Sequence, residues 1–114
     1  MILNNGTHRR DQILSRAMVD LMTSDHLTSD QRVGAEIFFG THSSWGLGIA
    51  VDIGRSEIYH MPGRYGWTGG TGTTAHNDPA KGMIAILFTQ RMMDSPDPPK
   101  VFTDFWTLAY AAIE

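Results

Sequence analysis

The feature that most constrains the fold is the stretch GRYGWTGGTGTTAHNDPAKG, residues 63–82, where six of twenty residues are glycine. Glycine stands where the backbone needs a positive φ or where another group comes close to the main chain. A phosphate-binding loop would need lysine and then serine or threonine after its last glycine, and a dinucleotide-binding turn would need a following helix. No lysine followed by serine or threonine comes after these glycines. TTAHND and the later MIAILFTQ favour extended chain instead of a helix. We therefore expect a strand whose Gly69 and Gly70 let a ligand or another backbone lie against its edge, and a bulged or closely packed strand is the alternative.

Hydrophobic periodicity predicts the elements on either side of this run. The segment WGLGIAVDI, residues 45–53, alternates and predicts a strand, and the continuous apolar run over residues 83–88 predicts a central strand. Apolar residues recur at helical spacing over residues 12–24 and 101–113. Thr28 to Gln31 has the form of a capping box that starts a short helical turn, and residues 33–44 are expected to be mostly loop.

The order of these elements predicts an α+β fold. Short turns between consecutive strands imply an antiparallel sheet, of three to four strands, and the N- and C-terminal helices are expected to pack on it. One core between the sheet and the helices is expected to hold Leu47, Ile49, Val51, Ile84, Ile86, Phe105 and Trp106.

Composition excludes several classes of partner and cofactor. The length of 114 residues allows one domain at most, and a net charge of −3 without a basic cluster argues against nucleic acid and anionic membranes. The absence of cysteine excludes disulfides, thiolate metal sites and a cysteine nucleophile. No apolar stretch is long enough to span a membrane, no secretory signal begins the chain, and its cellular location is not indicated. The histidines have no metal-ligand spacing and are each expected to be loop or surface residues, so no metal or other cofactor is predicted: His8, His26, His42, His60 and His76.

Several short motifs, in this order along the chain, resemble the C-terminal part of the serine β-lactamase-like family. That family includes class C β-lactamases, penicillin-binding-protein relatives and esterases of the same fold. The motifs are ILNNG at residues 2–6, WGLG at 45–48, PGRYGWTGGTGT at 62–73, the apolar strand ending in LFTQ at 87–90, and DFW at 104–106. The resemblance covers nearly the whole chain and implies that residues 1–114 form the C-terminal portion of a β-lactamase-like hydrolase domain.

The resemblance also implies a site. Trp67, Thr68 and Gly69 stand where the family has Lys-Thr-Gly or His-x-Gly on a strand that edges the active site, and Gly70 would then supply one oxyanion-hole N–H. Trp67 departs from that pattern, because it carries neither a positive charge nor a transferable proton, and it is more similar to the esterase-like branch. The family's Ser-x-x-Lys and Tyr-x-Asn are both missing from this chain, and in the family they lie upstream of the matched part.

Two functions follow as hypotheses. The first is a fragment of a serine hydrolase that contributes one wall of a site for a small acyl substrate and is inactive alone, because it lacks nucleophile and base. The second is a non-catalytic module that binds a small ligand or a partner along the exposed strand edge. That edge, from residues 66 to 73, also predicts self-association or marginal stability of the isolated chain.

Overall fold

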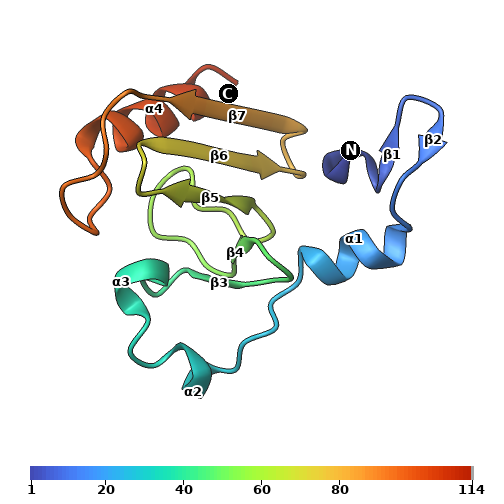
Figure 1. The fold of residues 1–114 in the computed structure, drawn as a ribbon, viewed down its shortest axis with the longest axis horizontal. Helices are drawn as coiled ribbons and strands as arrows, with labels where there is room; N and C mark the ends of the chain where they lie inside the picture. The colour runs from blue at the N-terminus through green and yellow to red at the C-terminus, as the bar shows by residue number, and fades with distance from the viewer. Residues whose placement is uncertain (114) are drawn as a thin grey trace.

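The computed structural model describes residues 1–113 and centres on a five-stranded antiparallel sheet (Figure 1). Each strand pairs with the next one along the chain, in the order β3-β4-β5-β6-β7. The strands span Ser43–Trp45 (β3), Ala50–Asp52 (β4), Tyr65–Gly69 (β5), Thr73–Asp78 (β6) and Met83–Phe88 (β7). The predicted α+β class with antiparallel pairing is confirmed, and the sheet has five strands rather than three to four.

The additional strand arises because WGLGIAVDI forms a hairpin instead of one strand. Trp45 ends β3 and Ala50 begins β4, and the Gly46 N–H donates to the Ile49 carbonyl at 2.8 Å across the turn between them. Gly48 within this turn has a φ of 79°, a conformation that favours glycine. Leu47 therefore lies exposed in the turn rather than on the core face of a strand.

Strand β7 is an edge strand, so the expectation of a central strand was wrong. Successive side chains of a strand point to opposite faces. Met83 and Ala85 pack against the core on the side of the C-terminal helix, whereas Ile84, Ile86 and Phe88 are exposed on the opposite face. A continuous apolar run indicated two covered faces here, but the structure covers only one of them.

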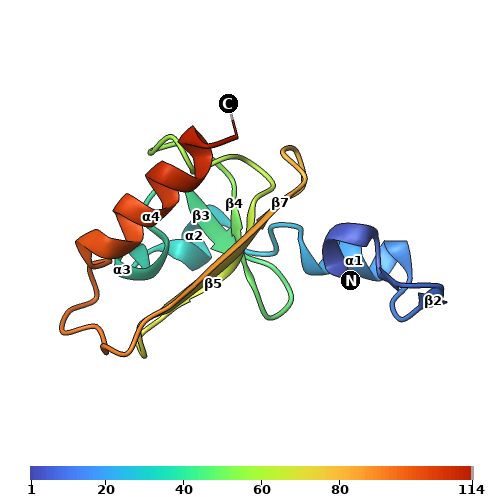
Figure 2. The same cartoon turned by 90° about the horizontal axis from the view of Figure 1, so that it is seen from above.

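The C-terminal helix α4 (Lys100–Ala111) packs across that one face of the sheet, as Figure 2 shows. Trp106 and Tyr110 are buried with Tyr59 in the core cluster, and Met83 and Phe105 pack at its margin. Two side-chain hydrogen bonds fix α4 to β6: Trp106 Nε1 donates to Thr74 Oγ1 at 3.1 Å, and Tyr110 Oη donates to Asp78 Oδ2 at 2.6 Å. The C-terminal helix was thus predicted correctly.

The N-terminal segment does not pack on the sheet, contrary to expectation. It comprises η1 (Ile2–Asn4), the two-stranded β1 (Thr7–His8) and β2 (Asp11–Gln12), and the helix α1 (Arg16–Met22), all of which lie beside the sheet (Figures 1 and 2). Helix α1 begins later than the periodicity predicted, because residues 11 and 12 pair as β2 and Ser15 caps the helix by accepting from the Met18 N–H. The Leu47 N–H donates to the Met22 carbonyl at 3.1 Å and joins the end of α1 to the β3–β4 turn.

Two short helices connect α1 to the sheet. Helix α2 (Ser29–Arg32) starts at the predicted capping box, in which Thr28 and Gln31 exchange hydrogen bonds. Helix α3 (Glu36–Phe39) lies in the segment that was expected to be mostly loop. Within residues 1–113, no helix is long and apolar enough to cross a bilayer.

The predicted core is correct in part. Val51 and Trp106 are buried and Ile49 and Phe105 are half-buried, but Leu47, Ile84 and Ile86 are exposed for the reasons given above. The core that forms is centred on aromatic side chains beneath α4 instead of on aliphatic residues of β7.

Candidate functional site

The glycine-rich run places an open strand edge in the middle of the sheet. Strand β4 pairs with β5 only at Tyr65 and Gly66, so residues 67–69 have β6 on one side and no β4 partner on the other. The reason is the tight turn between β3 and β4, which ends at Ala50. The residues before Ala50 turn away from β5 and do not pair with it. A Cβ placed on Gly70 would have no heavy atom within 4 Å, so open space lies beside the chain at this position.

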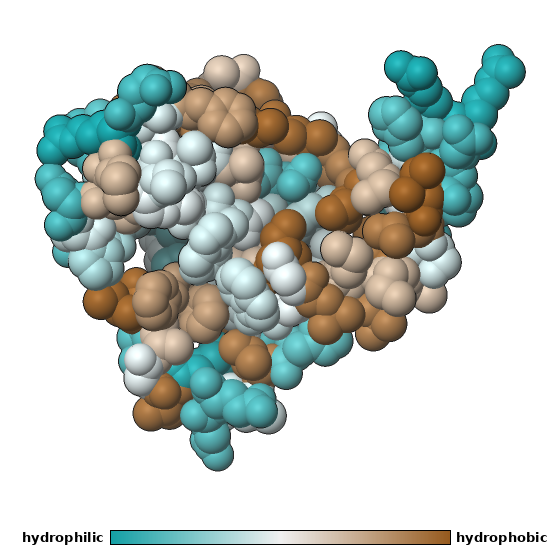
Figure 3. Space-filling view, in the orientation of Figure 1, coloured by the Kyte–Doolittle hydropathy of each residue, from teal (hydrophilic) through white to brown (hydrophobic). Residues whose placement is uncertain are grey.

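A cavity of about 780 Å³ lies along this edge, between the sheet, α3, α4 and the segment of residues 92–98. Figure 3 shows it as a hollow between the α3 region and that segment. Trp67, Thr68 and Gly70 line the cavity, whereas Gly69 lines a second hollow of about 390 Å³, which Trp67 also borders. The structure therefore brings three of the four predicted site residues to one cavity. The Trp67 ring meets Trp45 edge to face at 5.0 Å between centroids.

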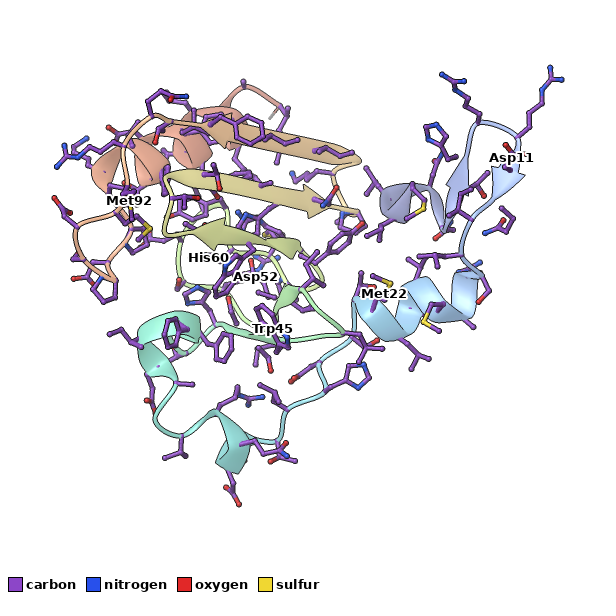
Figure 4. All side chains as sticks on the ribbon, viewed as in Figure 1. Asp11, Met22, Trp45, Asp52, His60 and Met92 are labelled. Carbon is purple, nitrogen blue, oxygen red and sulfur yellow. The ribbon has the colours of Figure 1, made fainter. Side chains whose placement is uncertain are left out.

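A buried ion pair forms part of the cavity wall. Arg64 Nη1 lies 3.0 Å from Asp52 Oδ2, and the two residues are only 2% and 4% exposed. Ser43 Oγ donates to Asp52 Oδ1 at 2.6 Å, and the Arg64 guanidinium lies over the Trp106 ring at 4.4 Å. Burial raises the pKa of Asp52, although the Ser43 hydrogen bond and the charge of Arg64 act in the opposite direction. The opposite charges of Arg64 and Asp52 neutralise each other. Figure 4 shows Asp52 in the interior near His60.

Three histidines also line this cavity: His42, His60 and His76. Burial, with smaller contributions from the charges of His42 and Arg64, lowers the pKa of His60 to about 3. Burial, followed by Arg64 and His60, lowers the pKa of His76 to about 2, and burial also lowers that of His42. All three imidazoles are therefore neutral at pH 7. The expectation that every histidine is a loop or surface residue was wrong for His76, which lies half-buried on β6 and meets Trp106 edge to face.

One hydroxyl lies next to a histidine of the cavity. Ser56 Oγ lies 2.7 Å from His60 Nδ1, which resembles a nucleophile beside a base, but an imidazole with a pKa of about 3 is a poor proton acceptor at neutral pH. No group of three metal-ligating side chains occurs within residues 1–113. What the cavity offers is a set of neutral hydrogen-bonding groups, an open backbone edge and aromatic walls.

Comparison with known proteins gives relatives but no family. No family model matches the chain. Two curated proteins of Mycobacterium tuberculosis are similar to it: uncharacterized protein MT1414 of strain CDC 1551 / Oshkosh and protein Rv1367c of strain ATCC 25618 / H37Rv. Each is 31% identical over 101 residues, which covers 82% of this chain and 25% of the relative. The chain thus spans about a quarter of the length of these relatives.

Proposed function

We propose that this chain is the C-terminal part of a β-lactamase-like serine hydrolase and forms one wall of its acyl-substrate cleft. The observation that carries the proposal is the open edge of β5 and the following Gly70, which border a cavity of about 780 Å³. Backbone N–H groups on an open strand edge can be directed at a developing oxyanion. The motif order along the chain supports this assignment, and so does the greater length of the two relatives.

Each residue of the edge has a separate role in this proposal. Gly70, which follows the open edge and lines the cavity, supplies the N–H. Trp67, which is exposed and rests against Trp45, forms an apolar side of the cleft. Thr68 is held by a 2.9 Å hydrogen bond between its Oγ1 and Thr74 Oγ1, which fixes the strand beside the cleft. The nucleophile and base come from outside these 114 residues, since the chain holds neither Ser-x-x-Lys nor Tyr-x-Asn.

A hybrid protein tests the proposal. In the hybrid, residues 1–114 replace the matched 101-residue segment of protein Rv1367c, and the hydrolysis of p-nitrophenyl butyrate is measured. We expect turnover by the hybrid, none by the 114-residue chain, and a loss of about 10²–10³ in kcat on Gly70→Pro, which deletes the N–H. Gly70→Ala is the matched control, because it keeps the N–H and enters open space. The proposal fails if neither Rv1367c nor the hybrid reacts with a fluorophosphonate probe, or if Gly70→Pro and Gly70→Ala have equal effects.

The cavity also favours a second candidate, a non-catalytic module that binds a small ligand. Its volume lies within the range of about 300–1,000 Å³ that is usual for ligand pockets, and it exists within this chain alone. The reading frame directly upstream of Met1 separates the two candidates. An encoded Ser-x-x-Lys followed by Tyr-x-Asn supports the hydrolase, and a stop codon without them supports the binding module.

A further inference from the structure

Two histidines of the cavity form a stacked pair that shares one serine. The His42 and His60 rings lie 3.7 Å apart between centroids at an interplanar angle of 29°. Ser56 Oγ lies 2.7 Å from His60 Nδ1 and 3.2 Å from His42 Nδ1. Because a serine hydroxyl has a single proton, it can donate to one of these nitrogens and must accept from the other.

A backbone group decides which nitrogen accepts. The Glu57 N–H is directed at His60 Nδ1 at 3.4 Å, so that nitrogen carries the lone pair. Ser56 then donates to His60 Nδ1 through the shorter contact and accepts from the Nδ1–H of His42. It follows that His60 carries its proton on Nε2 and that His42 has a lone pair on Nε2. The two adjacent rings thus present one donor and one acceptor.

Both Nε2 atoms are available to a ligand. Neither makes a hydrogen bond with any part of the chain that the structure describes, and neither is among the buried polar atoms that lack a partner. Both rings belong to half-buried residues that line the cavity. Protonation does not disturb the pair at pH 7, because burial lowers the pKa of both histidines.

We propose that this cavity binds a small apolar molecule through a neutral carboxamide, which accepts from His60 Nε2–H and donates its own N–H to His42 Nε2. An amide carries its acceptor oxygen and donor nitrogen on adjoining atoms, as the two rings carry the matching groups side by side. A carboxylate has no proton for the lone pair of His42. The neighbouring Arg64–Asp52 pair is already neutralised within the protein and offers no net charge to an anion.

The rim of the cavity defines the rest of the ligand. Ile37 and Phe38 of α3 lie exposed on one side. Met92 lies exposed on the other side (Figure 4). Exposed apolar side chains around a hollow are a surface that an apolar ligand body covers favourably. The ligand class is therefore an aryl or alkyl carboxamide. This inference does not depend on the hydrolase proposal, because it needs no nucleophile and no residue outside the chain.

Calorimetry on the 114-residue chain at neutral pH tests it with two probes of equal shape, 3-phenylpropanamide and 3-phenylpropanoate. We expect the amide to bind with a Kd at least about tenfold lower than that of the carboxylate. His42→Phe keeps an aromatic ring in the stack but removes the Nε2 lone pair that a carboxylate cannot satisfy, and it should abolish the preference. His8→Phe, an exposed histidine of β1 outside the cavity, is the matched control and should leave the preference intact.

Several outcomes would overturn the proposal: no binding of the amide at millimolar concentration, equal or tighter binding of the carboxylate, or a preference that survives His42→Phe. The imidazole nitrogen NMR shifts of the unchanged protein give a second test that needs no variant. They should report a proton on Nδ1 of His42 and on Nε2 of His60. The reverse assignment would remove the donor–acceptor pair from the cavity.

Discussion

At the scale of single residues, two buried tyrosines show what a hydroxyl contributes when it has a partner and when it does not. Tyr110 is 1% exposed and donates to Asp78 Oδ2, whereas Tyr65 is 2% exposed and its hydroxyl has no partner in the described residues. Tyr110→Phe should lower the free energy of unfolding by about 1.5–3 kcal/mol, because it leaves a buried carboxylate short of a hydrogen bond. Tyr65→Phe should leave the stability unchanged or raise it. Urea unfolding followed by tryptophan fluorescence measures both, and equal losses would contradict the expectation.

The neutral histidines of the cavity make stability depend on pH. His60 titrates near pH 3 and His76 near pH 2 in the folded chain, against 6.5 for an ordinary histidine. Between these values the unfolded chain binds more protons than the folded chain, so acid favours unfolding. We expect the free energy of unfolding to fall as the pH drops below about 6.5, by at most about 1.4 kcal/mol per pH unit for each histidine.

Glutamine variants identify the source of this slope. His60→Gln and His76→Gln should each flatten the dependence, because glutamine does not titrate in this range. The measurement is chemical unfolding at a series of pH values from about 7 to about 4. A slope that is unchanged in both variants would assign the acid sensitivity to other groups.

The sequence could indicate part of this site but not its chemistry. Trp67, Thr68 and Gly70 stand in the run for which the resemblance predicted a site, and the structure places all three at the cavity. The histidine pair has no such signal, because His42 precedes β3 and His60 lies in the loop between β4 and β5. Only the antiparallel hairpin geometry and the returning loop bring these rings into contact. The buried Arg64–Asp52 pair was missed for the same reason.

At the scale of elements, close approach between β5 and β6 depends on one glycine of the run. A Cβ on Gly66 would lie 2.2 Å from the Ala75 carbonyl oxygen, whereas a Cβ on Gly70 would touch nothing within 4 Å. Neither glycine has a positive φ, so backbone strain does not distinguish them. Gly66→Ala should therefore cost about 1–3 kcal/mol or more, because the paired strands must separate. Gly70→Ala should change stability by less than about 1 kcal/mol.

Thermal unfolding of the two alanine variants checks this difference. A Tm for Gly66→Ala within error of the unmodified chain would show that the strands are not packed as tightly as the structure has them. A large loss for Gly70→Ala would instead show that another group occupies the space beside Gly70.

Element boundaries show where the sequence pattern ceases to be informative. The alternation of WGLGIAVDI is correct for Val51, but it gives no sign that the chain reverses between Trp45 and Ala50. An alternating pattern shows which residues are apolar but does not show where the chain turns. The turn here depends on Gly48 in a left-handed conformation. The run MIAILF was likewise correctly predicted as a strand, yet its position at the edge depends on which strands are its neighbours.

At the scale of the whole molecule, one face of the sheet is covered and the other is not. Helix α4 lies on one face, and Ile84, Ile86 and Phe88 of β7 are exposed on the other, where Figure 3 shows hydrophobic side chains along the strand. A row of exposed apolar side chains such as this one often marks a surface that another segment or chain covers. The match to a quarter of each relative is consistent with a face that is covered in a longer protein, as the hydrolase proposal requires.

The isolated chain should therefore cover this face by self-association. Strand β7 is six residues long and contains neither charge nor proline. Within residues 1–113 it is bonded to another strand only along β6, so a second copy can pair with its outer edge. Such a contact is self-complementary under two-fold symmetry and joins the exposed apolar residues of both copies into one stripe.

Sedimentation velocity at micromolar concentration should detect a dimer. Ile86→Lys, at a residue 51% exposed on the open face, should dissociate it by placing a charge in the stripe. Leu108→Lys, at a residue 68% exposed on α4, is the control and should leave the dimer intact. A stable monomer that unfolds cooperatively with Trp67 shielded from solvent would count against both the association and the fragment proposal. The exposed face of the sheet would then need neither a second copy nor a further segment to cover it.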